Sequence, residues 1–237
     1  MVQQISLGGI DVDVVLKNIK NVHLSVYPPT GRVRISAPNR MSLANIRAFA
    51  ISKLAWIKKH QRKKLSQERE PARDYIERES HYIWGRRYIL AVVTHNAPPS
   101  VELRHRKIVL RLRPTSNLET REAVLNDWYR IRLKQAIQPI IDKWSPLIGV
   151  KVNGFAVRRM KTKWGSCNAS AGTLLFNTDL AKRPPPCLEY IVVHEMLHLL
   201  VRLHDDRFFA LLDKFMPNWR HVRQSLNGSP LSHVNWS

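Results

Sequence analysis

The sequence has little cysteine, no long apolar run and few acidic residues, and each shortage excludes a class of protein. Only 2 of the 237 residues are cysteines, which is too few for a disulfide framework and typical of a reducing compartment. No stretch approaches the roughly 18 consecutive apolar residues that a membrane helix needs. The first ten residues lack the basic and apolar regions of a secretory signal. We therefore expect a cytoplasmic protein with no membrane partner.

The scarcity of acidic residues leaves a large positive charge. The chain has 18 Asp and Glu against 39 Lys and Arg, a formal net charge of +21, and the excess is spread over the whole chain. Such a field attracts polyanions, so non-specific nucleic acid is a candidate partner. The densest run, Lys58–Lys64, continues a predicted helix. This run either contacts nucleic acid or is the solvated end of that helix.

The first part of the chain has the pattern of a sheet with a helix packed on it. Three segments, 12–16, 22–26 and 33–37, alternate apolar and polar residues with the period of a strand. The turn sequence Tyr27–Gly31 predicts a hairpin between the second and third segments. Ser42 is a predicted N-cap for a helix that continues to about Leu65.

The rest of the chain predicts a mixture of strands and helices after a linker at Ser66–Ser80. Residues 88–93 and 108–112 read as strands. A long helix is expected from Asn117 to about Trp144, with Leu118 and Ile131 among its inward residues and with Pro139 kinking it or ending it early. Further expected elements are a hairpin of 155–162 with 174–178, a helix over 187–203 and a last helix from Asp205 or Asp206 to before Pro217. The fold class is α+β, with a β-rich N-terminal half, residues 1–115, and a second subdomain, residues 116–237.

The predicted helix at 187–203 contains the sequence His-Glu-x-x-His. His194 and His198 are four residues apart, so both imidazoles lie on one helix face and can reach one metal ion, with Glu195 beside it. A metal lowers the pKa of bound water towards ~7, and the Glu can take the proton. Three polar residues in an otherwise apolar helix are costly to bury unless such a site satisfies them. The implied reaction is hydrolysis.

A third protein ligand is needed, and the sequence downstream narrows the choice. No Glu follows Glu195, and residues 199–203 contain no Gly, which excludes two common ligand arrangements. The remaining candidates are His204, Asp205, Asp206, Asp213 and His221. We favour His204, although a continuous helix would carry it to the far side. The helix is therefore expected to break between Val201 and Leu203.

Several motifs together resemble the YgjP-like metallopeptidase domain, a relative of the SprT/Spartan zinc proteases. They are Lys163-Trp164-Gly165-Ser166-Cys167, Leu175–Leu180, the His-Glu-x-x-His helix, His204 with Phe208-Phe209, and Pro217-Asn218-Trp219, with upstream matches at Trp56-Ile57, Trp84–Tyr88 and Trp128–Arg130. The resemblance covers about residues 12–226. It implies a zincin-like fold with the metal-binding helix packed beside a β-hairpin. It also implies one Zn²⁺ per chain, held by His194, His198 and His204, with Glu195 as the catalytic acid and base.

Other residues are candidates for binding substrate. We expect Arg158, Lys163, Trp164 and Asn177 to contribute, because such folds place this hairpin beside the metal helix, where cations can stabilise an oxyanion. Strand 174–176 could also pair with an extended peptide. Cys167 and Cys187 are expected to be structural rather than reactive.

The function that these observations favour is zinc-dependent hydrolysis of peptide bonds in a protein or peptide substrate. One alternative is a metal-dependent nucleotide phosphohydrolase, an activity attributed to a relative, with Arg158, Arg159 and Lys163 as the phosphate clamp. A second is a non-enzymatic nucleic-acid-binding module with a structural metal. A closed structural site usually has four Cys or His ligands, and Glu195 would have no task there.

Overall fold

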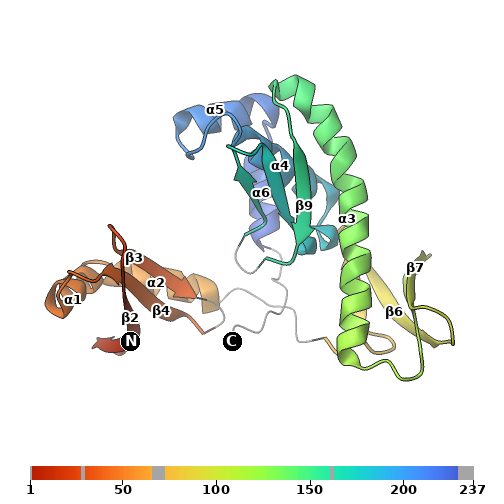
Figure 1. Ribbon diagram of the computed structural model, residues 1–237, viewed down its shortest axis with the longest axis horizontal. Coiled ribbons are helices and arrows are strands. Elements are labelled where there is room, and N and C mark those ends of the chain that lie inside the picture. The colour runs from red at the N-terminus through yellow and green to blue at the C-terminus, as the bar shows by residue number, and fades with distance from the viewer. Residues whose placement is uncertain (1, 28–29, 66–72, 161–162, 229–237) are drawn as a thin grey trace. The chain divides into compact units, whose positions relative to one another are not determined.

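The computed structural model describes residues 2–27, 30–65, 73–160 and 163–228, whose helices and strands are drawn in Figure 1. These residues form two compact units, which meet in sequence at the junction of Glu70 and Pro71. Unit 1 comprises the described residues 2–65, and unit 2 comprises the described residues 73–228. Of the predicted linker Ser66–Ser80, residues 66–72 lie outside the described residues.

Unit 1 is a four-stranded sheet with two helices. Its strands, in sheet order, are β1 (Val2–Leu7), β2 (Ile10–Lys17), β4 (Arg32–Pro38) and β3 (His23–Tyr27). The alternating residues of the predicted strands form the core, and Val12, Val33 and Ile35 are fully buried. The predicted hairpin is confirmed as the antiparallel β3–β4 pair. The edge strand β1 was not predicted.

The predicted helix after Ser42 is interrupted once. The Asn45 N–H donates to Ser42 Oγ at 3.3 Å, which confirms the N-cap. The helix then divides into α1 (Leu43–Ser52) and α2 (Leu54–Leu65). Ser52 Oγ donates to the Phe49 carbonyl at 2.7 Å, a side-chain hydrogen bond of the kind that competes with the helical pattern.

Unit 2 contains two further sheets and the remaining helices. The four-stranded sheet has the order β5 (Ser80–Ile83), β6 (Arg86–Thr94), β8 (Lys107–Leu112) and β7 (Ser100–Arg104). The three-stranded sheet has the order β10 (Gly165–Asn168), β11 (Thr173–Asn177) and β9 (Gly154–Arg158). The predicted strands near 88–93 and 108–112 are thus confirmed as β6 and β8.

The long predicted helix is α3 (Leu118–Ile148), which Asn117 caps by accepting the Thr120 N–H at 2.9 Å. Of the two expected effects of Pro139, an early end of the helix is wrong, because α3 continues past Pro139 to Ile148. A proline removes one helical hydrogen bond, and the buried residues on either side of Pro139 hold the helix in place. Leu118 and Ile131 do not face inward, being 50% and 47% exposed.

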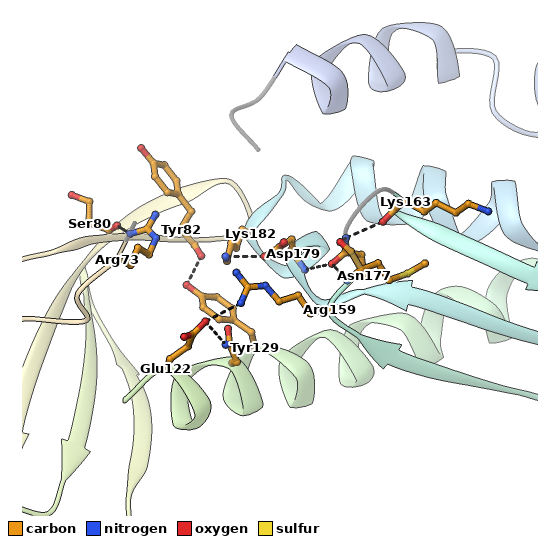
Figure 2. Close-up of polar contacts among 12 residues, drawn as sticks. Arg73, Ser80, Tyr82, Glu122, Tyr129, Arg159, Lys163, Asn177, Asp179 and Lys182 are labelled. Atoms are coloured by element: carbon orange, nitrogen blue, oxygen red, sulfur yellow. Dashed lines mark hydrogen bonds and ion pairs between the residues drawn. The ribbon is translucent and has the colours of Figure 1, made fainter. Parts of the chain in front are cut away.

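Helix α3 joins the two sheets of unit 2, as Figure 1 shows. Leu90 and Ile108 of the four-stranded sheet of unit 2 share one hydrophobic core with Leu125 of α3 and with helix α4 (Pro185–Leu197). The Tyr129 hydroxyl also donates to the Tyr82 carbonyl at 2.8 Å (Figure 2). The expected division at residue 115 therefore falls inside unit 2, because β5–β8 cannot bury their apolar face without α3.

The predicted hairpin of residues 155–162 with 174–178 is wrong in its pairing. Strand β9 pairs with β11 in parallel, and the antiparallel partner of β11 is β10. In the turn-rich sequence after Trp164, residues 165–168 are extended and form β10. Only residues 169–172 form the turn. Gly172 has a φ of +65° there, and Asn168 Oδ1 accepts the Ala171 N–H.

Three helices complete unit 2 after a short 3₁₀ helix, η1 (Thr178–Lys182). They are α4, α5 (Asp206–Phe215) and α6 (Trp219–Gly228). The helix expected over 187–203 ends at Leu197, whereas the start and end of α5 agree with the prediction. Helix α6 was not predicted. Among the described residues, no helix is both long and apolar enough to cross a membrane.

Candidate metal centre

Helix α4 holds the first two histidines on one face. Pro185 and Pro186 occupy its first turn, where an N–H would have no helical partner. Most of the helix is buried, and Val192, Val193, Met196 and Leu197 are fully enclosed. The ring centroids of His194 and His198, one turn apart, are separated by 4.9 Å.

The chain reverses after α4 and brings His204 back to these two residues. His198 caps the helix, and the N–H groups of Leu199 and Leu200 each donate to a carbonyl three residues earlier. His204 Nε2 then lies 3.0 Å from His194 Nε2 and 3.1 Å from His198 Nε2. The break occurs before the predicted 201–203, and the candidate ligand atoms of the three histidines all lie within 4.8 Å of one another.

The chemistry of the three rings fits a metal ion. His198 Nδ1 lies 2.9 Å from the Val201 carbonyl, which only accepts hydrogen bonds, so a neutral His198 carries its hydrogen on Nδ1. Its Nε2 lone pair then faces the other two rings. Burial lowers the pKa of His194 to about 3, and burial also lowers the pKa of His204. Both therefore favour the neutral form, which is the form that binds metals.

Phe208 forms an apolar support under all three rings. Its ring centroid lies 4.9 Å from that of His194, 4.6 Å from His198 and 4.8 Å from His204, and its side chain is fully buried. The Phe208 N–H donates to Asp205 Oδ1 at 3.0 Å, which makes Asp205 the N-cap of α5. The Asp205 carboxylate thus accepts a backbone hydrogen bond, and this N-cap fixes Phe208 beneath the histidines.

Glu195 is buried against strand β10. Its side chain is packed so closely on Gly165 that a Cβ at that position would lie 2.7 Å from Glu195 Oε1. Only 6% of the residue is exposed, and burial raises the pKa of Glu195 to about 7, although Lys163 opposes that shift. A carboxyl group with such a pKa can both accept and donate a proton near neutral pH.

A pocket of about 860 Å³ opens beside the histidines and Glu195. Of the residues expected to bind substrate, Lys163 and Trp164 line it. Arg158 does not, because it lies with Arg159 and Asp179 at a separate pocket of about 320 Å³. Arg159 pairs there with Glu122 at 2.8 Å (Figure 2). The phosphate clamp of Arg158, Arg159 and Lys163 is therefore not assembled in one pocket.

Asn177 holds a loop instead of facing this pocket. Its Nδ2 donates to the carbonyls of Met160 and Lys163, both at 2.9 Å, and its Oδ1 accepts the N–H groups of Met160 and Asp179. The residue is 5% exposed, and Figure 2 shows the Lys163 side chain pointing away from it. The Asn177 side chain therefore holds the backbone of Lys163 in place, and Asn177 is not among the residues that line the pocket.

The remaining expectations concern strand β11 and the cysteines. β11 is the central strand of its sheet, so it has no free edge for an added peptide. Cys167 lines the pocket, but burial and the nearby Glu195 raise the pKa of its thiol to about 11. Cys187 is buried. Neither thiol is therefore favoured as a nucleophile.

Several residues that line the pocket were not predicted from the sequence. Arg202, Phe209, Trp219 and Arg223 line the pocket, and Tyr190 lies one turn before His194 on α4. Trp219, Val222 and Leu226 are buried at helical spacing along α6. That spacing was the signal that could have revealed α6 and its cationic face.

The three converging imidazoles and the buried carboxylate next to them define a candidate metal centre of the His-Glu-x-x-His type. The chain belongs to the YgjP-like family, whose description is "YgjP-like, metallopeptidase domain", and it matches that family over residues 20–229. At family level it is therefore a metal-dependent peptidase. A comparison with curated proteins finds no match.

The solved structures that this chain is similar to include two metallopeptidase zymogens. The metallopeptidase zymogen of Pyrococcus abyssi abylysin is 16% identical, with a TM-score of 0.36 over 38% of this chain and 90% of that one. The metallopeptidase zymogen of Methanocaldococcus jannaschii jannalysin is 20% identical, with a TM-score of 0.33 over 40% of this chain and 92% of that one. The family assignment depends on neither.

Proposed function

We propose that the protein is a zinc-dependent peptidase with a zincin-like centre, in which His194, His198 and His204 hold one Zn²⁺ and Glu195 is the general base. The observation that carries this proposal is the convergence of three imidazole Nε2 atoms beside a buried carboxyl group. Imidazole donors suit zinc, whereas magnesium takes oxygen ligands. A bound zinc ion would polarise the peptide carbonyl and acidify water.

The protein's own residues would move the protons. Glu195 would take a proton from the attacking water and deliver it to the leaving amine, for which a pKa near 7 is suited. Gly165 allows the carboxyl group to lie against the pocket wall. Phe208 and the Val201 carbonyl would fix the orientations of the histidine rings.

The edge of the three-stranded sheet supports a peptide as the substrate. β10 is an edge strand of that sheet, and its residues Gly165–Asn168 line the same pocket as Glu195. An extended peptide can add to such an edge through main-chain hydrogen bonds. The nucleotide alternative has less support, because Arg158 and Arg159 lie outside this pocket.

The test of this function separates metal binding from turnover. Glu195→Gln should keep the metal and fold but lower kcat for peptide hydrolysis by about 10²-fold or more, because it removes the proton acceptor. Glu189→Gln is the matched control, since Glu189 is on the same helix but pairs with Lys143 and Trp144. Full activity in Glu195→Gln would contradict the assignment of the base.

We propose non-specific nucleic acid as a second partner, bound by unit 1. Residues 1–65 hold 12 Lys and Arg against only Asp11 and Asp13, and Asp13 is buried beside Arg32 at 2.5 Å. Helix α2 exposes several cations, together with Trp56, which is 40% exposed and stacked on His60 at 3.8 Å. Cations beside an exposed aromatic ring suit a polyanion with stacked bases.

A further inference from the structure

The pocket beside the metal centre is lined by cations and has a single acidic residue. Lys163, Arg202 and Arg223 line it, and Glu195 is the one carboxylic acid among its lining residues. Glu195 is 6% exposed and packs against Gly165. The wall of the pocket that meets a substrate is therefore positive, even apart from any metal ion.

Among the described residues, these three cations are not paired with acidic side chains of the protein. In the described part of the chain, none of the three forms an ion pair within 4 Å, whereas Arg220, on the same helix as Arg223, pairs with Asp213. Arg111 and Arg104 likewise share Glu102. The pocket cations are thus available to pair with an anionic group of a substrate.

An aromatic stack makes the wall behind Arg223 rigid. Trp219 stacks on Tyr190 with an interplanar angle of 9° and on Phe209 with an angle of 14°. Trp219 Nε1 donates to Asp213 Oδ1 at 2.7 Å, which fixes the indole ring. Arg223 Cζ lies 5.8 Å from the centre of that ring. The guanidinium is therefore held against a fixed apolar surface at the pocket.

We propose that this pocket selects peptides that carry a carboxylate close to the scissile bond, and that Arg202 and Arg223 determine this specificity. The carboxylate can come from an Asp or Glu side chain or from a free C-terminus. The inference rests on the proposed peptidase function and adds its substrate class. Charge-assisted hydrogen bonds from a guanidinium to a carboxylate supply the selectivity.

The experiment compares quenched fluorescent peptides that are identical except for Glu, Gln or Lys at each position flanking the cleaved bond. Each peptide is made with a free and with an amidated C-terminus, which separates the two sources of the carboxylate. With metal-loaded protein we expect kcat/KM for the best Glu or free-acid peptide to exceed that of its neutral counterpart by about ten-fold or more. The preference should shrink as the salt concentration rises.

The variants assign the preference to the named residues. Arg202→Gln with Arg223→Gln should reduce the preference to about two-fold or less while the neutral peptide is still cleaved. Arg223→Glu should shift the preference towards the Lys peptide, a reversal that a damaged fold cannot produce. Arg207→Gln and Arg220→Gln are the matched controls, since both arginines lie outside the pocket, and they should keep the wild-type preference.

Two negative results are distinguishable. If wild-type protein cleaves the Glu and Gln peptides equally, or if the double variant keeps the full preference, the specificity proposal is wrong and the peptidase function stands. If metal-loaded protein cleaves none of these peptides but hydrolyses a nucleoside triphosphate, the proposed peptidase function itself is wrong.

Discussion

Gly165 and Glu195 are packed so closely that the glycine is a requirement of the site. A methyl group at Gly165 would lie 2.7 Å from both Cγ and Oε1 of Glu195. Gly165→Ala should therefore displace the carboxyl group and lower kcat by about 10²-fold, with the metal retained. Gly154→Ala, in a strand of the same sheet, is the control, since a Cβ there meets no atom within 4 Å. Peptidase assays with metal analysis measure both, and a fully active Gly165→Ala protein would refute this packing argument.

His81 should make unit 2 less stable in acid. The residue is 1% exposed on β5, and burial, with Arg73 and Lys182 nearby, lowers its pKa to about 3. The Glu79 carboxylate is 3.5 Å away, but it is shared with Arg73. In the unfolded chain His81 has a pKa near 6.5, so as the pH falls it is protonated at a higher pH than in the folded protein. Stability is therefore lost as the pH falls from about 6.5 to about 3.

The measurement is denaturant unfolding of metal-free protein between pH 7 and pH 4. His81→Gln should lack this part of the pH dependence, which has a slope of at most about 1.4 kcal/mol per pH unit. Comparing the variant with wild type cancels the contributions of the other histidines. Identical pH slopes for the two proteins would rule out a buried neutral His81.

The start of helix α5 separates the roles of two adjacent residues. Asp205 accepts the Phe208 N–H as the N-cap, while the His204 ring faces the other histidines. Asp205→Ala should therefore cost about 1 kcal/mol of stability and leave metal binding intact, whereas His204→Ala should lose the metal. Asp206→Ala, one residue on, serves as the control for a charge in the first turn. Loss of the metal in Asp205→Ala would mean that the carboxylate, and not His204, is the third ligand.

Elements whose sequence pattern matches their environment were predictable. The alternation in β2, β3 and β4, the N-cap at Ser42 and the starts of α3 and α5 were predicted correctly because each depends on local residues. The direction of β9 was not predictable, since alternation does not distinguish a parallel from an antiparallel partner. The end of α4 was also missed, because residues 197–203 continue an apolar pattern with no Gly or Pro, and the reversal is set by tertiary packing.

The part of the candidate site that lies on a single helix was predictable from the sequence. The spacing of His194, Glu195 and His198 within one helix pointed to the metal centre, whereas the pocket around it draws on α4, β10, α6 and the loop before β10. Charge counts could not tell that Arg223 lines the pocket while Arg158 does not. Those assignments depend on which distant segments pack together.

The distribution of charge over the whole molecule leads to a prediction about nucleic acid. Because residues 1–65 contain far more basic than acidic residues, DNA binding should be non-specific in sequence and should weaken steeply between ~50 and ~200 mM salt. Gel retardation at several salt concentrations measures it. The informative variant neutralises the basic run of α2 together, at Lys58, Lys59, Arg62, Lys63 and Lys64.

That variant should bind DNA more weakly and keep its metal content. Neutralising Arg86, Arg87, Arg104, Arg106 and Lys107 in unit 2 is the control with an equal change in charge. No retardation by wild-type protein at low salt would disprove the proposal. Equal weakening in both variants would show that only net charge matters and that unit 1 has no special role.

The central claim is that three histidines from two segments of the chain hold one metal ion. The direct measurement is metal content per chain, by elemental analysis of protein purified without chelator and loaded with Zn²⁺. Wild-type protein and Glu195→Gln should each bind about one zinc, and His204→Ala should bind little or none because it removes a ligand that lies 3.0 Å from His194 Nε2. A zinc content near zero in wild-type protein, or wild-type zinc content in His204→Ala, would contradict the account.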